Sequence, residues 1–203
     1  ASSSQESSWA LPAPECLVPQ AHFLPEKEYQ MKHNVTLIGM PGAGKSTIGI
    51  VLAKVLGYDF IDSDLLIQKE EGKLLWEIMR DCGNDGFNQI EERVNSHIAA
   101  DLCVIATGGS VIYGEKAMKH LRSISTVVYL KVSHRVLERR LGDLQKRGVV
   151  LEPGQTLFDL YQQRIPLYEK YAHITVNVGH RSVANAVAAI TDALASSQAS
   201  GTL

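Results

Sequence analysis

The stretch Gly39-Met-Pro-Gly-Ala-Gly-Lys-Ser46 fits the phosphate-binding pattern G-x-x-x-x-G-K-[ST] at every fixed position. It follows an apolar run at residues 35–38 and leads into residues 45–56, where apolar side chains recur at helical spacing. This context predicts a buried strand, a glycine-rich loop whose N–H groups converge on phosphate oxygens, and a helix whose N-terminus attracts anions. The alternative, a glycine-rich turn before a purely structural helix, is disfavoured by the flanking strand and helix.

In a loop of this kind the lysine reaches the β- and γ-phosphates of a nucleotide, and the hydroxyl that follows is placed to ligate magnesium. The sequence therefore predicts a nucleotide with magnesium at this loop. The residues expected to bind the phosphates are Gly42, Ala43, Gly44, Lys45, Ser46 and Thr47.

The rest of the chain alternates short apolar runs with helical patterns. Strands are expected near residues 35–38, 59–62, 103–107, 126–132 and 174–178. Helices are expected near residues 45–56, 64–71, 73–81, 84–100, 134–141, 156–171 and 182–194. Strands separated by helices imply a parallel sheet covered on both faces. The predicted fold is α/β, a P-loop NTPase-type three-layer sandwich with a central five-stranded parallel sheet and ligands at the carboxyl ends of the strands.

Length and composition are those of a single globular domain, with 203 residues of which 45% are hydrophobic and 21% charged. A net charge of −2 gives no basic footprint for nucleic acid, and no apolar run is long enough for a membrane span. Cys16, Cys82 and Cys103 lack the spacing of a zinc site or redox motif, which favours a reducing compartment. A small enzyme or binding domain is the expected class.

Residues 1–30 differ in composition from the rest of the chain, with four serines in the first seven positions and four prolines after them. We expect an extended or flexible N-terminal arm, a domain at residues 31–195 and a short tail at residues 196–203. The arm is interpreted as a processed presequence remnant, a leftover of cloning or a docking segment for a protein partner or a second copy. Accordingly, the expected location is the cytoplasm, or an organelle stroma or matrix if the arm derives from a presequence.

Asp62 and Asp64 follow the second predicted strand two residues apart. In extended chain such residues project to the same face, so both carboxylates are expected to point toward the phosphate site. One acid there can orient a hydrated magnesium ion while the other accepts the proton of an attacking hydroxyl. The alternative is that Asp64 only caps a helix beginning at Leu65.

The third predicted strand, residues 103–107, ends without the acid that P-loop proteins often carry there, and Gly108-Gly109-Ser110 follows instead. Two glycines at the carboxyl end of a strand let backbone amides approach a ligand closely. A simple tight turn is the competing interpretation.

Together these residues resemble the shikimate kinase family across roughly residues 33 to 190. The resemblance rests on the phosphate loop, Phe60-Ile-Asp-Ser-Asp64, Gly83 with Phe87 and Ile90-Glu-Glu92, Gly108-Gly109, Val127-Val-Tyr-Leu130 and Arg164-Ile-Pro-Leu-Tyr168. It implies an enzyme that binds ATP and Mg²⁺, phosphorylates a hydroxyl of a small carboxylated ring and closes a lid, here at about residues 142–156.

The resemblance also implies a role for individual residues. Lys45 and Arg147 would act on the transferring phosphate, Asp64 would be the base, and Ser46 and Asp62 would hold magnesium. Arg140 would pack on adenine, with a solvated helix face as the alternative. Arg164, with Gly108 and Gly109, would bind the substrate, and a surface salt bridge is the alternative for Arg164.

Three positions depart from the family pattern. Asn88 stands where the family carries an arginine that anchors the substrate carboxylate, Ser110 replaces a third glycine, and Arg147-Gly-Val-Val150 replaces Arg-Pro-Leu-Leu. Loss of a bidentate arginine contact predicts roughly ten- to a hundredfold weaker shikimate binding. A different hydroxylated small molecule, still anionic because Arg164 remains, is an equal candidate.

The sequence leaves three functions open. The first is a small-molecule kinase that uses ATP and Mg²⁺. The second is a non-catalytic, nucleotide-binding subunit with a structural or regulatory role in a larger assembly, suggested by Asn88 and the arm. The third is a nucleoside-monophosphate or gluconate kinase, which the acidic pair and the segment 164–168 fit less well.

Overall fold

The computed structural model describes residues 33–141, 151 and 154–199. The predicted N-terminal arm and most of the predicted lid, including Arg147, lie outside these residues.

Five parallel strands form one sheet in the order β2-β3-β1-β4-β5, which confirms the predicted α/β fold. Their bounds are β1 Asn34–Ile38, β2 Asp59–Asp62, β3 Cys103–Ala106, β4 Ser125–Lys131 and β5 Ile174–Asn177. Strands β1 and β3 are fully buried and β4 nearly so, as expected for apolar runs in the middle of a parallel sheet.

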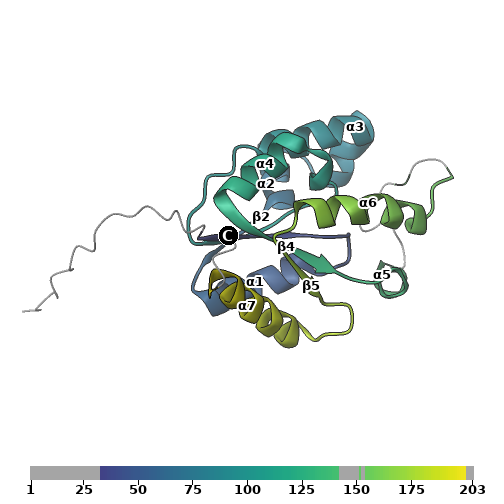
Figure 1. Cartoon of the computed structure of the whole chain (residues 1–203). Helices are drawn as coiled ribbons and strands as arrows, with labels where there is room; N and C mark the ends of the chain where they lie inside the picture. The colour runs from purple at the N-terminus through teal and green to yellow at the C-terminus, as the bar shows by residue number, and fades with distance from the viewer. Residues whose placement is uncertain (1–32, 142–150, 152–153, 200–203) are drawn as a thin grey trace, which may run out of the picture. The chain divides into compact units, whose positions relative to one another are not determined.

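Helices cover both faces of the sheet (Figure 1). They are α1 Lys45–Leu56, α2 Ser63–Glu71, α3 Leu75–Asn95, α4 Glu115–Ile124, α5 His134–Leu141, α6 Leu157–Tyr171 and α7 Val183–Ala199, with a short 3₁₀ helix η1 at Val111–Tyr113. Helices α1 and α7 pack together on one side, and α4 and α6 pack against β4 on the other. The part of the chain that the structure describes has no helix long and apolar enough to cross a membrane.

The helices differ from the expectations at three places. Helix α4 was not predicted, although it lies between β3 and β4 as a crossover requires. The expected break between the patterns at 73–81 and 84–100 is confirmed, because α3 consists of two helices that meet at the non-helical backbone of Gly83, but the second ends at Asn95 and not at residue 100. Helix α7 runs to Ala199, so the first residues of the predicted tail are helical.

The amino ends of the strands are held together by Asn34 at the start of β1. Its buried side chain donates to the carbonyls of Ala100 and Ile124, at 2.7 and 3.0 Å, and accepts from the Cys103 N–H at 3.0 Å. Loops at this edge are fixed by these bonds, while the loops after β1, β2 and β3 at the opposite edge carry the predicted site.

Candidate active site

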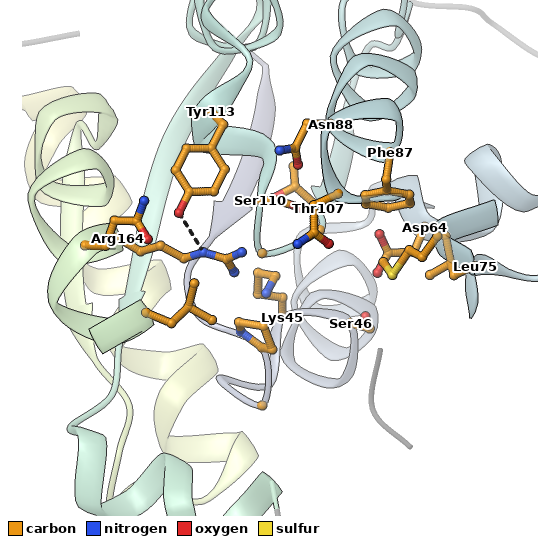
Figure 2. A pocket seen from close by; sticks show the side chains of 18 of the residues that line it. Lys45, Ser46, Asp64, Leu75, Phe87, Asn88, Thr107, Ser110, Tyr113 and Arg164 are labelled. Atoms are coloured by element: carbon orange, nitrogen blue, oxygen red, sulfur yellow. Dashed lines mark hydrogen bonds between the residues drawn. The ribbon is translucent and has the colours of Figure 1, made fainter. Parts of the chain in front are cut away.

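A pocket of about 570 Å³ opens at the carboxyl ends of β1, β2 and β3. Figure 2 shows its walls: Lys45 and Ser46 come from the start of α1, Asp64 from α2, Phe87 and Asn88 from α3, and Arg164 from α6. The predicted residues that line it are Gly42, Gly44, Lys45, Ser46, Thr47, Asp64, Asn88, Gly108, Gly109 and Arg164. Ala43, Asp62 and Arg140 do not line it. One cavity therefore combines most of the nucleotide and substrate predictions.

The backbone of the phosphate loop adopts conformations that glycine allows and other residues rarely adopt. Gly42 and Gly44 have φ of 77° and 98°, a region that residues with a Cβ rarely adopt. Gly44 is the N-cap of α1, so the first N–H groups of that helix face the loop. The arrangement is an anion-binding helix terminus of the predicted kind.

Lys45 is only 8% exposed, and its ammonium donates to the carbonyls of Gly39 and Met40 at 2.8 and 3.1 Å. Burial lowers the pKa of Lys45 to about 8, and the nearby Asp64 carboxylate opposes that shift. A buried cation held by two loop carbonyls is poised for an anionic partner such as a phosphate.

Asp62 and Asp64 are placed differently from the prediction, and of the two only Asp64 lines the pocket. Helix α2 begins at Ser63 and its N-cap is Asp62, whose carboxylate accepts from the Asp64 N–H at 3.0 Å. The extended-chain argument for both acids was therefore wrong, as was the alternative that Asp64 is the cap. Asp64 lies in the first turn of α2, where burial raises its pKa, Lys45 lowers it and Asp62 raises it. A carboxyl group of raised pKa beside a buried cation suits proton transfer.

The residues at this end of the pocket fit magnesium. Ser46 is exposed and lines the cavity, and the carboxylates of Asp62 and Asp64 are close enough to interact. Hydroxyl and carboxylate oxygens are the ligands that Mg²⁺ takes from proteins, with water and nucleotide phosphates supplying the rest.

Glu91, on α3, is a buried residue of the site to which the sequence assigned no role. It is 1% exposed, and its carboxylate forms no salt bridge among the described residues. Burial raises the pKa of Glu91 to about 7, and the neighbouring Ser110 hydroxyl lowers it. Helical spacing signals its burial, because Glu91 follows the buried Phe87 by four residues and precedes the buried Val94 by three.

Gly108 separates the carboxylates of Glu91 and Asp64. A Cβ at Gly108 would lie 2.1 Å from Glu91 Oε1 and 2.9 Å from Asp64 Oδ1. Only glycine leaves room for both acids, so the glycine pair is more than a tight turn.

Arg164 is 8% exposed and lies across the pocket from Asn88, as Figure 2 shows. Its Nε donates to the Tyr113 hydroxyl at 3.3 Å, and its guanidinium lies 5.3 Å from the centre of the Tyr113 ring. No carboxylate forms a salt bridge with Arg164 in the described part of the chain, so the surface-salt-bridge alternative is wrong. Arg164 is a buried cation that faces the cavity, and Tyr113 is a contact that the sequence did not indicate.

Arg140 lies behind the phosphate loop rather than on a solvated helix face. Its guanidinium donates to the carbonyls of Gly42, Ala43 and Gly179, at 3.3, 3.4 and 3.0 Å. It thereby joins the loop to the segment between β5 and α7. Contact with adenine stays a prediction.

Comparisons with known proteins agree with this geometry. The family model described as shikimate kinase matches residues 41–195. A shikimate kinase of Clostridium botulinum (strain 657 / Type Ba4) is 40% identical over 154 residues, 72% of this chain and 89% of the relative. One of Pasteurella multocida (strain Pm70) is 38% identical over 155 residues, 74% and 89% of the two chains.

Solved structures of shikimate kinases are also similar to this chain. The shikimate kinase from Acinetobacter baumannii in complex with shikimate is 31% identical, with a TM-score of 0.75 over 85% of this chain and 98% of that one. The shikimate kinase from Aquifex aeolicus is 30% identical, with a TM-score of 0.69 over 82% and 98%. The chain belongs to the shikimate kinase family of ATP-dependent small-molecule kinases.

Proposed function

We propose that this protein transfers the γ-phosphate of ATP to a hydroxyl of a small, carboxylate-bearing acceptor. The observation that carries the proposal is that Lys45, Asp64 and Arg164 line one pocket, with the half-buried Asp64 close enough to Lys45 for their charges to interact. A phosphate site, a base and a carboxylate-binding cation are the groups that such a transfer needs.

The phosphate loop would bind the nucleotide through its N–H groups and Lys45, whose ammonium would exchange loop carbonyls for phosphate oxygens. Ser46 and Asp62 would hold Mg²⁺, which neutralises charge on the phosphates. Arg164 would bind the acceptor carboxylate, and Gly108 and Gly109 would let the acceptor approach the backbone. Asp64 would accept the proton of the attacking hydroxyl. Arg147, outside the described residues, is proposed to act on the γ-phosphate.

Shikimate is the reference acceptor for a test, because a structural relative is described in complex with it. Since Asn88 supplies no positive charge, we expect shikimate to bind roughly ten- to a hundredfold more tightly to the variant Asn88→Arg. The KM for shikimate in a coupled ADP-release assay measures this, with the KM for ATP as the control.

ADP release that requires an acceptor hydroxyl supports the proposal. Tight binding of ATP and magnesium with no phosphoryl transfer to any member of a panel of hydroxylated acids would contradict it. That outcome would favour a non-catalytic nucleotide-binding subunit.

A further inference from the structure

Tyr113 lines the pocket beside Arg164, on the short 3₁₀ helix η1 that follows Gly108-Gly109-Ser110. Its side chain is half-buried, and Figure 2 shows its hydroxyl directed at the Arg164 side chain. The Tyr113 oxygen lies 3.3 Å from Arg164 Nε. A phenol and a guanidinium therefore lie next to each other in the wall of the cavity.

The hydrogen bond between these two groups has only one possible direction. A guanidinium has N–H donors and no acceptor, so Arg164 donates and the Tyr113 oxygen accepts. The phenol proton takes no part in this bond, and a phenol can donate one hydrogen bond while it accepts another. Tyr113 can therefore donate its proton to an oxygen atom of a ligand in the pocket.

Hydrogen bonds hold η1 and α6 in place around this pair. The Tyr113 N–H donates to the Ser110 carbonyl at 2.9 Å, which fixes the turn of η1. One helical turn after Arg164, the buried Tyr168 hydroxyl donates to the Gly109 carbonyl at 2.6 Å. This bond joins α6 to the segment that leads into η1. The phenol and the guanidinium are thus preorganised, which lowers the entropy cost of binding a ligand to them.

A carboxylate is the ligand group that fits such a pair of donors. It has two acceptor oxygens on one plane, and charge-assisted hydrogen bonds to it are stronger than those to a neutral oxygen. Arg164 forms no salt bridge among the described residues, so its guanidinium can bind a carboxylate in the cavity. Because the Tyr113 hydroxyl is 3.3 Å from Arg164 Nε, one carboxylate can contact both side chains.

We propose that Tyr113 is a second carboxylate-binding residue of the acceptor site, whose phenol donates to the same acceptor carboxylate that Arg164 binds. This inference rests on the proposed kinase function and adds a specificity-determining residue to the same site. Tyr113 then favours an acceptor with a carboxylate over one with a neutral group at the same place, because the neutral group accepts a weaker hydrogen bond.

Shikimate and its methyl ester test this assignment, because they share the ring and the hydroxyls and only the acid carries the charge. Calorimetric titration of each in the presence of ADP and magnesium measures binding without turnover. Tyr113→Phe keeps the ring and removes the hydroxyl. We expect it to raise the Kd for shikimate about tenfold and the Kd for the ester less than about twofold, with no change in the Kd for ATP. A hydroxylated acid that binds more tightly replaces shikimate, together with its own methyl ester.

The matched control is Tyr58→Phe, which removes the hydroxyl of a half-buried tyrosine outside the pocket. This variant should leave the Kd values for the acid, the ester and ATP unchanged.

A second substitution separates direct contact from an effect through Arg164. Replacement of Tyr113 by 3-fluorotyrosine makes the phenol more acidic, and hence a stronger hydrogen-bond donor and a weaker acceptor. At a pH at which the phenol keeps its proton, a residue that donates to the carboxylate should bind the acid about twofold more tightly after this replacement. A residue that only holds Arg164 in place should bind it more weakly.

Three results would overturn the inference. They are an equal change for the acid and the ester in Tyr113→Phe, weaker binding of the acid with 3-fluorotyrosine, and an unchanged protein that binds no hydroxylated acid more tightly than its ester. Phosphoryl transfer from ATP, measured on the same proteins, separates this inference from the kinase function. Transfer together with any of the three results leaves the kinase function intact. The expected binding changes without transfer to any acid would support the carboxylate site and contradict the kinase function.

Discussion

Glu91 has a buried carboxyl group that forms no salt bridge among the described residues, so its charge state affects the stability of the fold. Burial raises the pKa of Glu91 from 4.5 to about 7. Between these pH values the folded protein holds a proton that the unfolded chain has released. This contribution of Glu91 to stability is therefore fully present below about pH 4.5 and is lost as the pH rises through about 7.

We predict that Glu91→Gln removes this pH dependence. Relative to the variant, the unchanged protein should lose up to about 3 kcal/mol of unfolding free energy between pH 4.5 and pH 8. Urea unfolding of both proteins at several pH values measures the difference. Parallel stability curves would show that Glu91 is not held protonated by burial.

A second prediction concerns Gly108, which lies between Glu91 and Asp64. Gly108→Ala puts a methyl group in contact with both carboxylates, so we expect a loss of about 1–3 kcal/mol of stability. Displacement of Asp64 should also reduce kcat by at least about tenfold.

Because the clash with Glu91 is the closer one, Gly108→Ala should cost less stability in a Glu91→Ala background than in the unchanged protein. A double-mutant cycle of unfolding free energies checks this coupling, and additive effects would refute the packing described for Gly108.

At the scale of elements, Gly83 divides α3 into two parts. Its backbone, with φ 68° and ψ −174°, belongs to a region that is almost exclusive to glycine. Residues of both parts line the pocket: Leu75 and Met79 before the break, and Asn84, Asp85, Phe87 and Asn88 after it. The break therefore sets the direction of the second part of α3 relative to the first, and with it the shape of this side of the pocket.

Gly83→Ala tests this role. No atom lies within 4 Å of the added Cβ, so the cost is that of the backbone alone, about 1–3 kcal/mol. Thermal or urea unfolding measures it, with Gln89→Ala at an exposed position of the same helix as the control. We also expect the KM for the acceptor to rise and the KM for ATP to change little. An equal rise in both KM values would contradict the role assigned to Gly83.

Local sequence patterns predicted most helices and strands but not all of the points at which they begin and end. The strands were predictable because short runs rich in apolar and β-branched residues, bounded by polar turns, are typical of strands in a parallel sheet. Helix α4 was missed although its buried Ala117, Met118 and Leu121 have helical spacing among charged residues. The start of α2 at Ser63 depended on the choice between two aspartates as cap, which local sequence did not decide.

At the scale of the whole molecule, the sheet order brings separate segments of the chain to one edge. Loops after β1, β2 and β3 were predictable site elements, because the carboxyl ends of adjacent parallel strands converge. Tyr113 and Glu91 were not assigned to the site, because their roles depend on how η1, α3 and α6 pack against each other. The predicted partner or oligomer contact of residues 1–30 falls outside the described residues and stays a prediction.

The proposed activity of this pocket is phosphoryl transfer and not nucleotide binding alone. Asp64→Asn keeps the size of the side chain and removes the proposed base, while the phosphate loop and Lys45 remain. The decisive measurement is transfer of labelled γ-phosphate from ATP to an accepted hydroxylated acid by the unchanged protein and by this variant, with ATP binding measured in parallel. We predict bound ATP in both proteins, transfer by the unchanged protein and at least about a hundredfold lower kcat in Asp64→Asn. Equal transfer by both proteins, or ATP binding without transfer by either, would contradict the claim.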